Sequence, residues 1–256
     1  MNTGWQAVYT EPGPGPQPFL TESPDISVFH DTSCDCNKFI IYYASITRNT
    51  ISMLMSADDN PLGTYTYMGE LNGIQGYDPN LMYHPRGLFL LYSNFNQLNV
   101  VQLSGNQPWV VIRGPTTIAV PDQPWELLDG QLVEAPASIV IGGVANVVYS
   151  TNAYWLAGYT CGILRSPVTA DPLDASAWIK SPVPVFTSNV INSAYGPGSG
   201  TFFTDGNNQL WWGYGAFNNP GGVPSNAAGR TIRMQLTGIA ADGSVCLGTP
   251  GSYPSS

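Results

Sequence analysis

The sequence predicts an all-β fold of the β-propeller class, and three observations support it. Only 10% of the residues are charged, whereas 28 Gly, 22 Pro and 14 Tyr provide turn-formers and strand-forming aromatics. No long segment shows the apolar periodicity of a helix. Four tyrosines that end apolar strands recur at separations of 49, 57 and 65 residues, close to the size of one propeller blade.

Each repeating unit is expected to hold three or four strands. The strands that end in tyrosine and small residues span 39–45, 88–94, 146–151 and 210–216. The strands expected before them span 26–29, 80–83, 138–141 and 201–203, and those after them 50–55, 98–103, 159–164 and 231–236. A sandwich would show shorter and more even strand spacing, so the long period favours a propeller.

Composition and charge limit the classes of binding partner and the cellular compartments that fit this chain. The formal charge of −9 argues against nucleic acid or an anionic membrane as a partner. No apolar run approaches the length of a bilayer-spanning helix, and no secretion signal opens the chain. Residues 1–24 are rich in proline and glycine and are expected to form an extended approach segment.

The four cysteines do not fix the compartment. Cys34 and Cys36 lie in a polar loop, Cys161 in an apolar strand and Cys246 near the C-terminus. The paired spacing of structural zinc sites is absent, so buried thiols or one disulfide are expected and no metal site is.

Carboxyl groups recur where the innermost strands begin. Asp25, Asp78, Glu134 and Ser199 lie 18, 14, 15 and 15 residues before the four repeating tyrosines. Because the first strand of each blade lines the propeller axis, these positions are expected to be equivalent and to face one another. Converging carboxyl groups separate one another's pKa values, as acid/base sites require. The alternative is that Asp25 and Asp78 cap turns beside prolines.

Glu134 is the strongest candidate among these groups. It stands between hydrophobic residues and precedes an apolar strand at 137–141. Partial removal of water there would raise its pKa and favour the protonated form that a general acid needs. The alternative is a solvated glutamate in a loop.

Several segments, in order along the chain, carry a resemblance to a known family. They are 58–65, Tyr77-Asp78-Pro79, Trp125-Glu126, 133–136, 178–186, 195–198, 230–235 and Asp242-Gly243. The chain resembles glycoside hydrolase family 43, the five-bladed propeller enzymes that release arabinose or xylose units from plant polysaccharides. The resemblance implies an inverting α-L-arabinofuranosidase or β-xylosidase, acting on oligo- or polysaccharides outside the cell.

The resemblance also implies roles for three carboxyl groups. Glu134 matches the general acid and Asp78 the aspartate that tunes its pKa. Inversion places the acid and the water-activating base about 6.5–9.5 Å apart. No position matches that base, and Asp25 is considered as a substitute from the neighbouring blade.

The chain departs from the family pattern in several places. Four blade units are counted where five are expected, so one domain spanning 1–256 is expected to be incomplete at its N-terminus. Unpaired strand edges at the first and last units would invite self-association. Ser199 and Gly215 replace two histidines of the pattern, which argues against an axial calcium or sodium ion, and no cofactor is expected.

Two further hypotheses stand beside the hydrolase. A catalytically inactive carbohydrate-binding propeller would follow from the missing base. A protein-interaction propeller would expose an apolar patch and lack an acidic axial pocket. The side chains considered for sugar binding, each of which could instead serve packing or surface roles, are Tyr77, Trp125, Trp155, Ser199 and Arg233.

Overall fold

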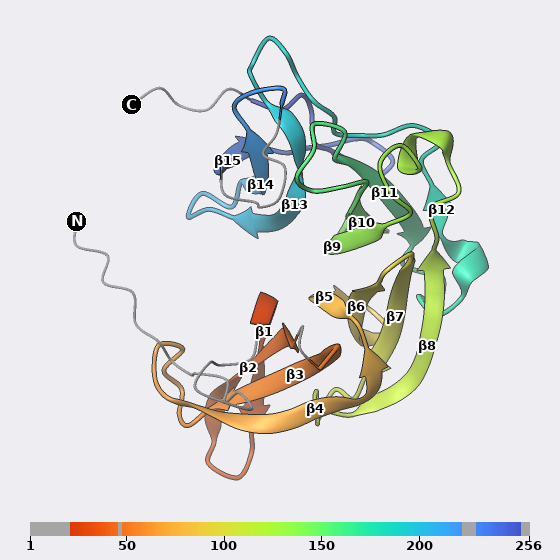
Figure 1. Cartoon of the computed structure of the whole chain (residues 1–256). Helices are drawn as coiled ribbons and strands as arrows, with labels where there is room; N and C mark the ends of the chain where they lie inside the picture. Colours follow the sequence, from red (N-terminus) through yellow and green to blue (C-terminus); the bar gives the residue numbers. More distant parts are fainter. Residues whose placement is uncertain (1–20, 46–47, 222–228, 252–256) are drawn as a thin grey trace.

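Four antiparallel sheets follow one another along the chain and form the blades of a β-propeller (Figure 1). The structure is a computed structural model that describes residues 21–45, 48–221 and 229–251. The sheet orders are β1-β2-β3-β4, β5-β6-β7-β8, β9-β10-β11-β12 and β13-β14-β15. The predicted all-β propeller with four represented blades is therefore confirmed.

The strands have the following bounds. The first sheet comprises β1 (Thr21–Asp31), β2 (Cys36–Ser45), β3 (Thr50–Ser56) and β4 (Tyr65–Gln75). The second comprises β5 (Tyr77–His84), β6 (Gly87–Asn94), β7 (Gln97–Leu103) and β8 (Val111–Ala119). The third comprises β9 (Val133–Ile141), β10 (Val144–Thr151), β11 (Thr160–Pro167) and β12 (Ile179–Lys180). The fourth comprises β13 (Tyr195–Thr204), β14 (Leu210–Phe217) and β15 (Arg230–Leu236).

Four short elements complete the described part of the chain. The short elements are η1 (Pro124–Glu126), η2 (Ala175–Ala177), β16 (Gly238–Ile239) and β17 (Val245–Cys246). The strands β4, β8 and β12 are absent from the sequence prediction. The outermost strands β4 and β8 are partly exposed and interrupted by glycine or proline, so they carry little apolar periodicity, and β12 has only two residues.

The innermost strand of every sheet carries a β-bulge near its start. Two of its residues lie opposite a single residue of the second strand, and the second of the two is a proline in each sheet. These prolines are Pro24, Pro79, Pro136 and Pro197. Proline has no N–H to donate to a ladder, so it is accommodated where the ladder is interrupted.

The bulges correct one prediction about the carboxyl groups. Glu134 directly precedes its bulge, Asp78 is the first bulge residue, and Asp25 directly follows its bulge. The prediction that these positions are equivalent is therefore wrong. Ser199 lies in a second bulge of β13, opposite Tyr214, which only the fourth sheet has.

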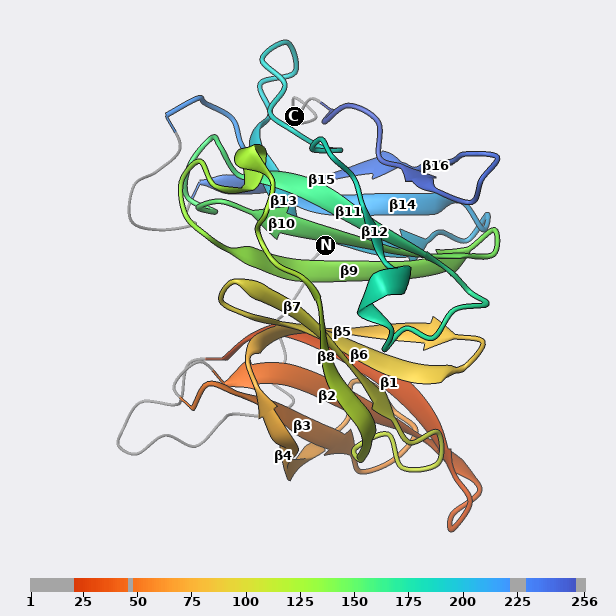
Figure 2. The ribbon, with the colours of Figure 1, turned by 90° about the vertical axis from the view of Figure 1, so that its right-hand side faces the viewer.

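Apolar cores fill the spaces between successive sheets, whose innermost strands contact one another in order (Figure 2). The first interface holds Tyr42, Leu90 and Val101. The second holds Phe89, Val147 and Tyr149. The third holds Phe186, Trp212 and Tyr214. Because each sheet buries its face against its neighbour, the relative positions of the innermost strands are fixed.

The last sheet leaves one face uncovered among the described residues. Ile232, Met234 and Leu236 of β15 are 81%, 63% and 52% exposed, and Phe203 stacks on Trp211 on the same side. The expectation of unpaired strand edges and self-association stays a prediction. The domain assignment of 1–256 stays a prediction.

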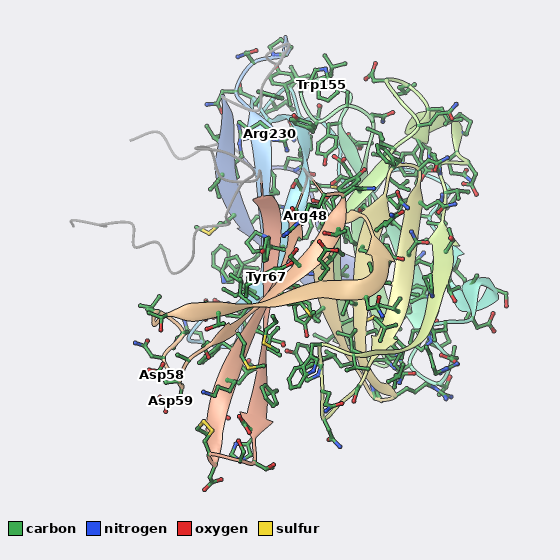
Figure 3. The ribbon with its side chains drawn as sticks, turned by 60° about the horizontal axis from the view of Figure 1, so that its bottom comes forward. Arg48, Asp58, Asp59, Tyr67, Trp155 and Arg230 are labelled. Carbon is green, nitrogen blue, oxygen red and sulfur yellow. A yellow bond between two sulfur atoms is a disulfide. The ribbon has the colours of Figure 1, made fainter. Side chains whose placement is uncertain are left out.

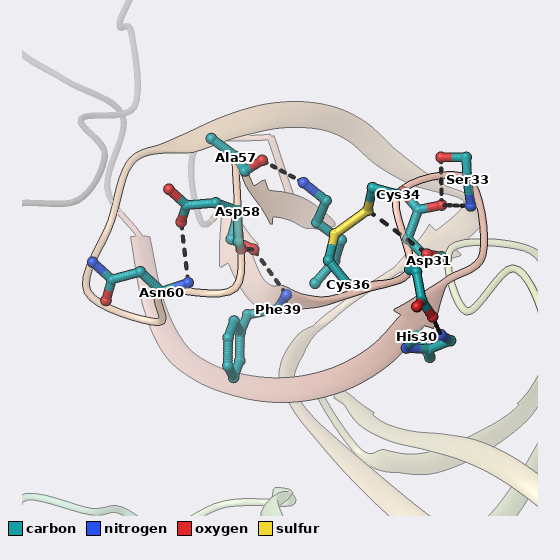
Figure 4. The surroundings of a disulfide bond; sticks show 12 residues. His30, Asp31, Ser33, Cys34, Cys36, Phe39, Ala57, Asp58 and Asn60 are labelled. Atoms are coloured by element: carbon teal, nitrogen blue, oxygen red, sulfur yellow. Dashed lines mark hydrogen bonds and ion pairs between the residues drawn. A yellow bond between two sulfur atoms is a disulfide. The ribbon is translucent and has the colours of Figure 1, made fainter.

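A disulfide joins Cys34 and Cys36 in the exposed turn between β1 and β2 (Figure 4). Cys161 is free and buried, and Cys246 is free and exposed. One of the two outcomes expected for the cysteines, a single disulfide, is therefore confirmed. No helix in the described part of the chain is long and apolar enough to cross a membrane.

Gly76 joins the first sheet to the second in a conformation that only glycine fits well. Its φ is +148°, and a Cβ atom there would lie 2.2 Å from the carbonyl oxygen of Ser93. We expect Gly76→Ala to lower the free energy of unfolding by roughly 2–4 kcal/mol, through strain and overpacking. Gly105→Ala, where a Cβ would meet nothing within 4 Å, is the matched control. Equal urea midpoints for both variants would contradict this expectation.

Candidate active site

A cavity of about 160 Å³ opens where the innermost strands begin. The side chains that line it include Asp25, Asp78, Asn80 and Ser199, contributed by β1, β5 and β13. Ala135, the neighbour of Glu134, lines it from β9. The four innermost strands thus bring three predicted site residues to one place.

Asp78 links β5 to the strand that carries Glu134. Its Oδ2 atom accepts a hydrogen bond of 2.9 Å from the backbone N–H of Ala135. Both residues have left-handed φ angles, +52° for Asp78 and +48° for Ala135. Aspartate tolerates this region better than most residues because its short side chain bonds locally. The bulge therefore places a carboxylate directly against the backbone beside Glu134.

Asp25 makes the corresponding link between β1 and β5. Its Oδ2 accepts from the backbone N–H of Leu81 at 2.7 Å and from the amide of Asn80 at 3.1 Å. Its Oδ1 accepts from its neighbour Ile26 at 2.8 Å. Burial raises the pKa of Asp25, although the hydrogen bonds from Leu81 and Ile26 oppose that rise. Both oxygens of Asp25 therefore help to join the first two sheets.

Glu134 is half-buried, and Tyr159 holds its carboxylate. The Tyr159 hydroxyl donates to Oε1 of Glu134 at 2.7 Å. The pKa of Tyr159 lies well above its usual value, because the ring is buried and because Glu134 is negatively charged. The guanidinium carbon of Arg230 lies 4.9 Å from the Tyr159 ring centre. The expected rise in the pKa of Glu134 stays a prediction.

Sequence reasoning missed Tyr159, Arg230 and Asn80. Asn80 is the counterpart of Asp25 one sheet later, since its Oδ1 accepts from both the N–H and the hydroxyl of Ser138. The sequence signal that could have identified Asn80 is its place directly after Pro79, because Asp25 directly follows the corresponding Pro24. No local pattern marks Tyr159 or Arg230, because Tyr159 is 25 residues from Glu134 in the sequence and Arg230 lies over the Tyr159 ring from another sheet.

Two of the aromatic residues predicted to bind sugar, Trp155 and Tyr77, are partly exposed. Trp155 lies in the loop between β10 and β11, edge-on to Tyr154, whose carbonyl accepts from Arg230 (Figure 3). Tyr77 directly precedes Asp78 and contacts the ring of Phe95. Both are partly exposed and stay candidates for contacts with sugar.

Trp125 and Arg233 are placed in packing roles instead. Trp125 stacks on Tyr149 and donates through Nε1 to the carbonyl of Pro182. Arg233 is 3% exposed on β15, the outermost strand of its sheet. Its guanidinium donates to the carbonyls of Asn192, Ser193, Phe217 and Gly251. These contacts agree with a packing role for Arg233, and its role in sugar binding stays a prediction.

Glu126 is a second buried carboxylate with a different environment. It is fully buried and accepts from Lys180 at 2.9 Å, from the Tyr149 hydroxyl at 2.5 Å and from the backbone of Asp122 and Gln123. Its charge is balanced and its oxygens are occupied by protein donors. Glu126 therefore anchors the loop before β9 and is not a candidate acid.

No group of three His, Cys, Asp or Glu side chains that could hold a metal ion occurs within 21–45, 48–221 and 229–251. The expectations about an axial ion and about cofactors stay predictions.

The raised pKa of Asp25 predicts a pH dependence of stability. The folded protein holds this proton more tightly than the unfolded chain, so the associated stability is present below pH 3.8 and lost as the pH rises through the folded pKa. We expect the unfolding free energy of the wild type to fall, relative to Asp25→Asn, as the pH increases across that window. Urea titrations at several pH values test this, and a constant or opposite difference would refute it.

Comparison with known proteins supplies independent evidence. The profile of "Glycosyl hydrolases family 43" matches residues 24–245. An "Extracellular exo-alpha-(1->5)-L-arabinofuranosidase" of Streptomyces avermitilis is 34% identical over 146 residues, covering 56% of this chain and 30% of the relative. "Alpha-L-arabinofuranosidase B" of Pyricularia oryzae is 33% identical over 146 residues, with the same coverage. The chain thus spans about a third of the length of these relatives.

Solved structures agree on the fold. An α-L-arabinofuranosidase from Lactobacillus brevis superposes with a TM-score of 0.80 at 21% identity, covering 93% of this chain and 78% of that one. An endo-1,4-β-xylanase from Bacteroides thetaiotaomicron gives a TM-score of 0.70 at 21% identity, covering 86% and 73%. Because the family profile spans most of the chain, from the bulge of β1 to β17, the protein belongs to glycosyl hydrolases family 43.

Proposed function

We propose that this protein hydrolyses O-glycosyl bonds of arabinose-containing plant polysaccharides as an α-L-arabinofuranosidase. The proposal depends on the arrangement around Glu134. The Tyr159 hydroxyl donates to the Glu134 carboxylate, and the backbone N–H of the next residue, Ala135, donates to Asp78. Two relatives named as arabinofuranosidases support the choice of arabinose. Structural neighbours named for xylan support β-xylosides as the other substrate class.

Glu134 is assigned the role of general acid, which gives its proton to the leaving glycosidic oxygen. Tyr159 positions this carboxyl, since its buried ring fixes the direction of the hydroxyl. Asp78 acts on the pKa of Glu134 through its negative charge, one residue away across the Ala135 hydrogen bond. Inversion then requires a water on the opposite face of the sugar and a base about 6.5–9.5 Å from the acid.

Asp25 is the candidate base from the described residues, and its environment bears on a second function. Three donors occupy three of the roughly four lone-pair positions of its carboxylate, which leaves about one position for a catalytic water. This favours, as the second candidate, a carbohydrate-binding propeller with weak or no hydrolysis. Extracellular action is proposed for either function, by analogy with the Streptomyces relative.

The hydrolase proposal is tested by Glu134→Gln, which keeps the side-chain shape but cannot donate the proton. We expect kcat on 4-nitrophenyl α-L-arabinofuranoside to fall by about 10²–10⁴-fold. Asp59→Asn, a carboxyl-to-amide change in an exposed loop, is the control and should leave turnover unchanged. Full activity of Glu134→Gln would remove this residue from the mechanism.

Tyr159→Phe tests the positioning role. Loss of the hydroxyl removes the hydrogen bond to Glu134 and leaves the ring in place. We expect kcat to fall by roughly tenfold with KM little changed, and the pH profile to shift because the acid loses a donor. An unchanged pH profile would mean that Tyr159 has only a structural role.

The second candidate predicts binding without products. Calorimetry with arabino- and xylo-oligosaccharides, followed by product analysis after long incubation, separates the two functions. Binding with no released pentose would select the carbohydrate-binding propeller, whereas steady release would exclude it.

A further inference from the structure

A second and larger cavity, of about 520 Å³, opens between the first and second sheets. Gln75 at the end of β4, Asn94 at the end of β6 and Gln97 at the start of β7 contribute to its lining. Gln75 lines this cavity and Asp78, three residues later in the sequence, lines the axial one. Its volume falls within the range of about 300–1,000 Å³ typical of small-molecule sites.

The lining of this cavity is rich in side-chain amides that make no hydrogen bond to other described residues. Asn72, Gln75, Asn94 and Gln97 make no side-chain hydrogen bond to other described residues. The one carboxylate in the lining, Glu70, is paired with Arg48 at 3.3 Å. The cavity therefore presents many donors and acceptors but little net charge.

The floor of the cavity is built from buried polar side chains. Tyr92 is 4% exposed and Asn99 5% exposed. Asn99 accepts a hydrogen bond of 2.8 Å from Thr117, whereas the Tyr92 hydroxyl has no partner among the described residues. Burial raises the pKa of Tyr92 to about 12, so the hydroxyl stays a donor at neutral pH. A buried tyrosine hydroxyl usually finds a partner, so one at a cavity floor is available to a ligand.

We propose that this cavity is a second carbohydrate-binding site, which holds a neutral oligosaccharide beside the axial site. Amide groups both donate and accept, as sugar hydroxyls do, so Asn94 and Gln97 match such a ligand. A phosphate or other anion would require uncompensated Arg or Lys, and a hard cation would require several free carboxylates. The proposal rests on the proposed function only for the choice of arabinose as the sugar.

The site is tested by binding of arabinotriose to the protein that carries Glu134→Gln, which prevents turnover during titration. We expect the double change Asn94→Ala and Gln97→Ala to weaken affinity at least about fivefold, because two or more hydrogen bonds are lost. Tyr92→Phe, which removes one hydroxyl, should weaken it about two- to fivefold. Asn207→Ala, an exposed amide in the turn between β13 and β14, is the control and should bind normally.

Activity measurements separate this proposal from the proposed function. With Glu134 intact, the Asn94 and Gln97 double variant should hydrolyse the nitrophenyl arabinoside normally and show a raised KM on polymeric arabinan. If the wild type had no activity on the nitrophenyl arabinoside, the proposed function would be wrong, but the arabinotriose titration would still test the second site. Arabinotriose affinity unchanged by both the double variant and Tyr92→Phe, or no binding at millimolar concentration, would overturn the second site.

Discussion

The arrangement depends on side chains that tie each innermost strand to the next one. Asp25 accepts from Leu81 across the first interface, and Asp78 accepts from Ala135 across the second. At the third interface the acceptor lies on the second strand instead, where the hydroxyl of Ser150 on β10 accepts from the backbone of Ser199. Ala135 and Ser199 lie in bulges, which leave backbone N–H groups without a ladder partner, and these acceptors satisfy them. The need to pair those groups therefore also collects acidic side chains around the axis.

The environment, and not the residue type, separates the roles of the two glutamates near β9. Glu126 is fully buried, and its carboxylate accepts hydrogen bonds from Lys180, from Tyr149 and from two backbone N–H groups. Glu134 is half-buried, accepts a hydrogen bond from Tyr159, and directly precedes Ala135, which lines the axial cavity. The donors around Glu126 fix the direction of its carboxylate, whereas Glu134 is partly exposed.

The central strands of each sheet could be predicted because their apolar runs end in tyrosine and small residues. The outer strands could not, since packing on one side leaves no clear period in β4 or β8. Glu134 and Asp78 could be chosen as candidates from the sequence, but Tyr159 could not, because a side-chain contact between residues 25 positions apart leaves no local pattern. Asp25 was found for the wrong reason, as its place after the bulge differs from that of Asp78.

The left-handed backbone at Asp78 changes how any mutational scan of this site should be interpreted. At φ +52° an alanine is conformationally strained, and it would also leave the N–H of Ala135 without its acceptor. A slow alanine variant would therefore combine altered chemistry with a shifted strand. Asparagine adopts this conformation readily and keeps an acceptor oxygen, so Asp78→Asn isolates the contribution of the negative charge itself.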